Sequence, residues 1–177
     1  MISRNWAQRF DRLDQRITSW MAAHGILLLR VSVGIVFLWF GVLKFIPGLS
    51  PADALATKTI TVLTFGIVPP DISRPVLVLW ETIIGIGLIT GLYMRVTLLL
   101  LFVQMLGTVT PLVLFPAETW SRFPIVPTLE GQYILKNMVL VTAGIVIGAT
   151  VRGGGLIPSD AALMKDHSLH QIEVEQH

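Results

Sequence analysis

The sequence VLVLWETIIGIGLIT, residues 76–90, is apolar at almost every position and contains a single carboxylate, Glu81. A helix needs roughly 20 apolar residues to cross the hydrocarbon core of a bilayer. Four runs are long enough, and the second begins at Pro75, a residue suited to the first turn of a helix. The pattern predicts an all-α integral membrane protein, a four-helix bundle whose spans lie at about 26–45, 75–93, 96–116 and 132–151.

The composition agrees with a membrane protein and argues against several kinds of site. Of the 177 residues, 53% are hydrophobic and 14% are charged, whereas a soluble domain carries about 25% charged residues. The net charge of +2, without a basic cluster among aromatics, indicates no nucleic-acid partner. The chain has no cysteine, and its four histidines all lie outside the apolar runs. We therefore expect no metal site, and no cofactor bound covalently or through His or Cys.

The distribution of basic residues predicts the topology. Four spans would bring the segment before span one, the link between spans two and three, and the segment after span four to one side of the membrane. Basic residues on short loops mark the cytoplasmic side. We therefore expect a multi-pass membrane protein with both termini in the cytoplasm. The residues that carry this prediction are Arg4, Arg9, Arg12, Arg16, Arg95, Arg152 and Lys165.

The segments around the spans complete the expected organisation. Residues 1–24 form an amphipathic helix whose apolar stripe lies in the membrane interface or, alternatively, docks on a partner or on the end of the bundle. Residues 25–152 form the membrane domain, and residues 153–177 form a cytoplasmic tail. In the first outer loop, a short helix through about 51–65 begins at Ser50-Pro51-Ala52-Asp53. The stripe consists of Trp6, Phe10, Leu13, Ile17 and Trp20.

Charged and polar side chains inside the spans converge on the outer half of the bundle. Lys44 ends span one, Glu81 lies about 9 Å inward from Pro75, and Lys136 lies about 7 Å inward from Gly131. Because an isolated charge in a bilayer is costly, we expect Glu81 to pair with Lys44, Lys136 or both. The predicted pocket residues are Lys44, Glu81, Gln104, Tyr133, Lys136 and Asn137.

Several charged and polar residues of the spans also have a purely structural interpretation. A buried carboxylate–lysine cluster can fix the register of helices, and Lys44 or Arg30 can extend its charge to the membrane surface. Gln104 is suited to joining two helices by a hydrogen bond. Tyr133 suits an aromatic belt at the interface.

Three stretches carry a family resemblance. LLLRVSVGIVFLWFGVLKF (27–45), WETIIGIGLITGLYMR (80–95) and PTLEGQYILKN (127–137) resemble the DoxX-like superfamily of bacterial four-helix membrane proteins. They are most similar to the branch that contains the reactive-chlorine-resistance membrane protein. The resemblance covers about residues 25–151. The family-like positions are Arg30, Gly34, Gly41, Lys44, Glu81, Glu130, Gly131 and Lys136.

The resemblance implies an inner-membrane bundle linked to redox chemistry or oxidative stress, and two functions follow as expectations. In the first, the chain binds a quinone or similar amphiphile and receives electrons from an oxidoreductase partner subunit. In the second, it is a non-catalytic module in the lipid bilayer: a small-solute carrier, which would require a homo-oligomer, or an anchor for a partner protein. Whether the chain is itself an enzyme stays open.

Overall fold

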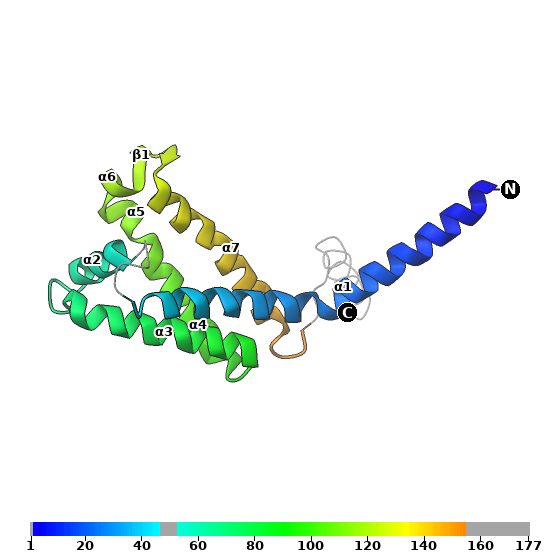
Figure 1. Ribbon diagram of the computed structural model, residues 1–177, viewed down its shortest axis with the longest axis horizontal. Coiled ribbons are helices and arrows are strands. Elements are labelled where there is room, and N and C mark those ends of the chain that lie inside the picture. The colour runs from blue at the N-terminus through cyan, green and yellow to red at the C-terminus, as the bar shows by residue number, and fades with distance from the viewer. Residues whose placement is uncertain (1, 47–52, 155–177) are drawn as a thin grey trace, which may run out of the picture.

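The structure is a computed structural model that describes residues 2–46 and 53–154, with side chains from residue 9 onward. Four of its helical segments are long and apolar enough to cross a membrane: Arg9–Leu43, Pro70–Thr90, Met94–Leu114 and Leu129–Thr150. The predicted all-α four-helix membrane bundle is confirmed. Figure 1 shows α1 (Ile2–Leu43), α3 (Pro70–Thr90), α4 (Met94–Val109) and α7 (Leu129–Thr150) as its principal helices.

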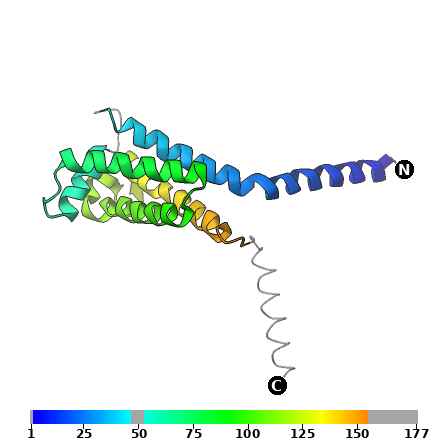
Figure 2. The same cartoon turned by 90° about the horizontal axis from the view of Figure 1, so that it is seen from below.

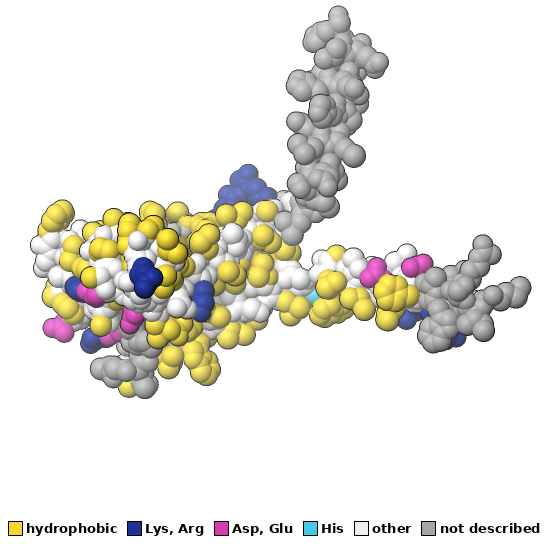
Figure 3. Space-filling view, turned by 90° about the horizontal axis from the view of Figure 1, so that it is seen from above, with side chains coloured by type: hydrophobic (Ala, Val, Ile, Leu, Met, Phe, Trp, Pro, Cys, Tyr) yellow, Lys and Arg dark blue, Asp and Glu magenta, His cyan; other side chains and the backbone are white. Residues whose placement is uncertain are grey.

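The four helices pack as a ring in which α1 contacts α3, α3 contacts α4, α4 contacts α7, and α7 contacts α1. Large apolar side chains fill the centre, whereas many others lie on the outer surface (Figure 3). Such a surface suits contact with lipid tails, because apolar side chains exposed to lipid carry no free-energy penalty. The buried core consists of Val33, Phe37, Ile84, Leu88, Leu98, Leu101, Met105, Ala143 and Ile147.

Glycines bring α1 and α3 together over most of their shared length. A Cβ added at Gly34 would lie 3.0 Å from the Gly85 carbonyl oxygen, and one at Gly85 would lie 2.7 Å from the Leu38 nitrogen. Any larger residue would push the two backbones apart. Gly34, one of the family-like positions of span one, therefore lies directly against α3, as close helix packing in membranes requires.

The N-terminal segment continues α1 instead of forming a separate helix. The helix runs without a break through His24 and Gly25, and its first part extends away from the bundle (Figures 1 and 2). Phe10 and Trp20 in this part are 70% and 55% exposed. The predicted helix is thus present, and the described members of its apolar stripe, from Phe10 to Trp20, are exposed. Its position in the membrane interface stays a prediction.

The prediction that Pro75 opens the second helix was wrong. α3 begins at Pro70, with Pro69 in extended conformation before it, and Pro75 lies inside the helix. A proline lacks the N–H that would bond the residue four positions earlier, here Asp71. Glu81 consequently lies eleven residues after the helix start, at a depth of about 16 Å.

Pro111 divides the third span into α4 and α5 (Pro111–Leu114). Proline cannot donate a hydrogen bond to the Gly107 carbonyl. The Thr110 amide and hydroxyl donate to it instead, at 3.3 and 2.7 Å. The Gly107 carbonyl therefore keeps hydrogen-bond donors despite the proline, and both helices remain parts of one membrane-crossing segment.

Short elements cover the end of the bundle where Lys44 lies. The predicted loop helix is present as α2 (Asp53–Leu63), whereas Ser50 and Pro51 lie outside the described residues. α6 (Pro116–Thr119) leads into a hairpin of β1 (Trp120–Arg122) and β2 (Val126–Pro127), which the sequence did not predict. Arg74 of α3 binds Asp53 of α2, with 2.7 Å between Nε and Oδ2.

Candidate functional site

A buried polar cluster joins three of the helices. Lys44, directly after α1, forms an ion pair with Oε1 of Glu81 on α3. The side-chain amide of Gln104 on α4 donates a hydrogen bond to the same oxygen, at 3.0 Å. We call Lys44, Glu81 and Gln104 the polar triad. The structure brings these three predicted residues together from distant parts of the sequence.

The two charged members of the triad, Lys44 and Glu81, are buried away from solvent. Lys44 is 7% exposed and Glu81 is 6% exposed. Desolvating two charges is costly, and their mutual attraction offsets that cost only with good geometry and further hydrogen bonds. Gln104 supplies one such bond. Oε2 of Glu81 is buried and finds no hydrogen-bond partner among the described residues, so half of the carboxylate is left able to accept a proton or a donor.

Gly41 allows α1 to approach Glu81. A Cβ at this position would lie 3.2 Å from the Glu81 Cβ and 3.3 Å from the Thr82 nitrogen. A side chain at position 41 would therefore press on the α3 backbone beside the carboxylate. The family-like residues Gly41, Lys44 and Glu81 thus act as one structural unit.

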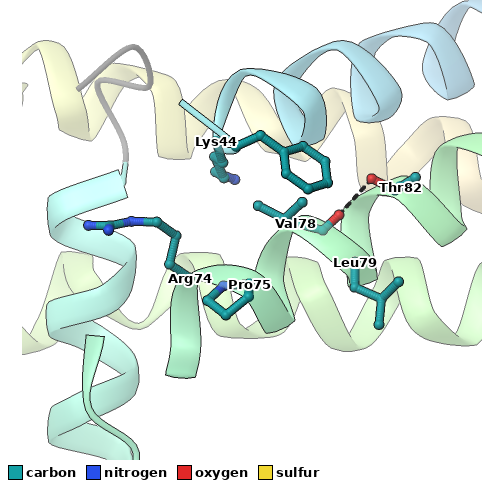
Figure 4. Close-up of a pocket in the computed structure, with 7 residues that line it drawn as sticks. Lys44, Arg74, Pro75, Val78, Leu79 and Thr82 are labelled. Carbon is teal, nitrogen blue, oxygen red and sulfur yellow. Dashed lines mark hydrogen bonds between the residues drawn. The ribbon is translucent and has the colours of Figure 1, made fainter. Parts of the chain in front are cut away.

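A pocket of about 290 Å³ lies beside the triad, between the end of α1 and the first half of α3. Figure 4 shows Lys44 and Val78 directed into the space between the helices, whereas Arg74 turns toward α2. Glu81 and Gln104 are not among the residues that line the pocket. The lining residues are Lys44, Phe45, Arg74, Pro75, Val78, Leu79 and Thr82.

The predicted candidates on α7 lie elsewhere. Lys136 is exposed and stands over the Tyr133 ring, 5.5 Å from its centroid, and forms no ion pair in the described chain. Lys136 is therefore not the partner of Glu81. Tyr133 is 51% exposed. Asn137 reaches the Thr108 hydroxyl at 3.4 Å, a long contact.

The direction of the α7 side chains explains this outcome. α7 buries Ile134 against the bundle, and Lys136 follows two positions later, about 200° around the helix. Depth along the chain placed Lys136 in the same half of the bundle as Lys44, but its rotation about α7 carries it away from Glu81.

The remaining family-like positions lie outside the polar triad and its pocket. Gly34 lies in the α1–α3 contact, and Arg30 lies at the opposite end of the bundle, against Gly91. Gly131 lies under the Thr119 carbonyl, where a Cβ would come within 2.0 Å of the oxygen. Glu130 is exposed in the first turn of α7.

Several pocket residues were missed by sequence reasoning. Val78 precedes Glu81 by three positions and so shares its side of α3, and Thr82 follows Val78 by four positions and shares the side of Val78. Both could have been included on this spacing. Nothing in the sequence distinguishes Phe45 and Leu79 from ordinary lipid-facing residues. No group of three or more His, Asp or Glu residues that could hold a metal ion occurs in the described ranges.

The comparisons with known proteins give one match. The DoxX family model matches residues 25–115, just over half of the chain. The matched region includes all three residues of the polar triad and ends before α7. No curated protein and no solved structure matches the chain.

Proposed function

This chain belongs to the DoxX family, and from that premise we propose that it is a redox-associated membrane subunit that binds a quinone or a similar amphiphile. The pocket between α1 and α3 is the proposed site. The observation that carries the proposal is that a mainly apolar slot contains the buried Lys44 ammonium, whose counter-charge is Glu81. We further propose that the protein lies in the bacterial inner membrane, in the reactive-chlorine-resistance branch of the family.

The chemistry of the lining suits a quinone head group. An ammonium has three N–H donors, and Lys44 uses one toward Glu81. Among the described residues no other group accepts from Lys44, so in this proposal its remaining donors bind a carbonyl oxygen in the pocket. Phe45, Val78 and Leu79 supply apolar surface for the ring. Small-molecule sites combine these features: an apolar wall and few, well-placed polar groups.

The size and position of the pocket indicate how the ligand would enter. A volume of about 290 Å³ lies at the lower end of the usual range for small-molecule sites, roughly 300–1,000 Å³. Phe45 and Leu79 at its edge are 67% and 61% exposed, so the pocket opens on the lipid-facing surface. A ring would occupy the pocket while an apolar tail stays in the bilayer.

The triad would supply protons but not electrons. Reduction of a quinone to a quinol consumes two electrons and two protons. In this proposal a partner oxidoreductase subunit delivers the electrons. The Lys44 ammonium holds the exchangeable proton beside the pocket, and the ionised carboxylate of Glu81, through its buried Oε2, accepts each replacement proton from solvent. Two such transfers deliver both protons.

The experiment identifies molecules that the protein retains and measures the binding of a quinone probe. Mass spectrometry should detect a quinone among the molecules retained by the purified protein. Decylubiquinone, a short-chain probe, should raise the melting temperature of the delipidated protein. Leu79→Trp would fill the mouth of the pocket and should abolish that shift. Leu99→Trp is the matched control, because Leu99 is 62% exposed on α4 and does not line the pocket.

Two results would count against the quinone site. One is the absence of both a retained quinone and a thermal shift in wild-type protein. The other is an unchanged shift in Leu79→Trp, which would place the probe elsewhere. A shift lost in Leu79→Trp and kept in Leu99→Trp supports this site.

A second candidate function, an anchor for a partner protein, is favoured by the extension of α1. Phe10, Leu13, Ile17 and Trp20 expose about half or more of their surface on a helix that leaves the bundle (Figure 2). If anchoring is the function, deleting residues 1–20 should release a co-purifying partner. Quinone retention by the bundle would then be absent in both the full and the shortened chain.

A further inference from the structure

The end of the bundle opposite the polar triad contains a second cavity around Arg30. Arg30 precedes Lys44 by fourteen residues on α1, a separation of about 21 Å along the helix. The cavity measures about 410 Å³, and it plays no part in the proposed quinone site. Residues from α1, α4 and α7 line it, among them Ile26, Leu27, Arg30, Met94, Ile147 and Thr150.

The Arg30 guanidinium is held in place by the end of α3. Gly91 ends α3 in the left-handed conformation, with φ of 78°. A Cβ at Gly91 would lie 2.5 Å from Nη1 and 3.1 Å from Cζ of Arg30. The absence of a side chain at position 91 therefore provides the space that the guanidinium occupies.

Arg30 lacks a counter-charge in the part of the chain that the structure describes. Its Nε is buried without a hydrogen-bond partner there, and none of the ion pairs found there includes Arg30. A buried donor without an acceptor costs free energy, more so when it is charged. The cavity beside this guanidinium is where an acceptor can be placed.

The surroundings of the cavity are basic. Arg95 follows the lining residue Met94, and Arg152 follows the lining residue Val151; both arginines are exposed. The stretches 23–30, 90–97 and 147–154, which form this end, contain no Asp or Glu. The local charge therefore favours an anion.

We propose that this cavity binds the phosphate of an anionic phospholipid. The Arg30 guanidinium is the direct ligand of the phosphate, because its planar donors match phosphate oxygens. Ile26, Leu27 and Ile147 line the apolar part, where the start of an acyl chain lies. Basic pockets between membrane helices bind anionic head groups by the same combination. A free phosphate ion would use only the arginine and not the apolar wall.

The test measures lipid retention by native mass spectrometry. Protein reconstituted in nanodiscs of mixed phosphatidylglycerol and phosphatidylcholine is released at high salt, which screens exposed charges more than buried ones. Wild-type protein should retain phosphatidylglycerol preferentially. Arg30→Gln should reduce that retention at least about tenfold. Arg95→Gln, the matched exposed control at the same end, should reduce it by less than about fivefold.

A second variant keeps the test decisive if Arg30→Gln does not fold. Ala23 is exposed and lines the cavity, so Ala23→Trp would fill the cavity without disturbing the core. It should also lose the retained phosphatidylglycerol. Equal retention by wild type and either variant would overturn the proposal, as would equal retention of phosphatidylcholine. Thermal protection by inorganic phosphate as large as that by phosphatidylglycerol would show a free-anion site and reject the lipid.

Discussion

Lys44 and Glu81, 37 positions apart in the sequence, form a buried ion pair that joins the end of α1 to α3. Gln104 adds α4 to the same contact through a 3.0 Å hydrogen bond. Three helices are thus connected at one level of the bundle. Such a cluster can determine helix register, support ligand binding, or do both. These roles predict different effects of mutations on stability and on ligand binding.

Replacing one member of the ion pair should destabilise the bundle strongly. Glu81→Leu leaves Lys44 buried and uncompensated, at a cost of about 3–5 kcal/mol. The double change Lys44→Leu, Glu81→Leu should recover most of that stability. Unfolding in mixed micelles, followed by circular dichroism, measures both. If the double variant also binds decylubiquinone as the wild type does, the pair is structural and the proposed site is wrong.

Gly85→Ala should separate α1 from α3. The new Cβ would lie 2.7 Å from the Leu38 nitrogen, so the backbones must shift, at about 1–3 kcal/mol. Gly107→Ala is the matched control, because nothing lies within 4 Å of a Cβ there. It should leave the melting temperature unchanged or raise it slightly. Equal effects of the two changes would show that the α1–α3 contact is not this close.

The Arg74–Asp53 pair should stabilise the docking of α2. Asp53 is 8% exposed; Arg74 binds its Oδ2, and its Oδ1 has no hydrogen-bond partner in the described ranges. Because the Arg74 side chain is 34% exposed, solvent screening limits the loss in Arg74→Gln to roughly 1–3 kcal/mol. Lys58→Gln breaks the exposed Lys58–Glu118 pair and should cost at most about 1 kcal/mol. Hydrogen exchange of the α2 amides compares the two variants.

Both termini should label from the cytoplasmic side. The chain has no cysteine, so single cysteines at Asn5, Ser121 and Lys165 report topology without background. A membrane-impermeant maleimide added to intact cells should react at position 121 and spare positions 5 and 165. Reaction at either terminal position from outside would reverse the predicted orientation.

Deleting residues 1–20 should leave four inserted spans. The described side chains of this segment, residues 9–20, are all exposed, so the bundle loses little packing. The melting temperature of the shortened protein should stay close to that of the full chain. A shortened protein that fails to insert would show that the segment directs topology.

Much of the architecture was predictable because its signals are local. Length and apolar composition alone determine which segments can cross a bilayer, and all four were found. Gly34, Gly41 and Lys44, which the family resemblance marked, are seven and three positions apart, a spacing that puts them on one face of a helix. The structure turns that face toward α3. The predicted loop helix is also present, as α2, whereas its predicted cap at Ser50 and Pro51 lies outside the described residues.

Other features depended on how complete helices pack. Depth along the chain allowed both Lys44 and Lys136 as partners of Glu81, and only the rotation of α7 in the bundle excludes Lys136. The start of α3 at Pro70 and the unbroken path of α1 through Gly25 likewise override local proline and glycine signals. The sequence by itself determined the spans and the polar residues they contain, because hydrophobicity and helical period act within one segment. Tertiary structure decided which of those residues meet, because rotation and tilt are determined only by contacts between segments.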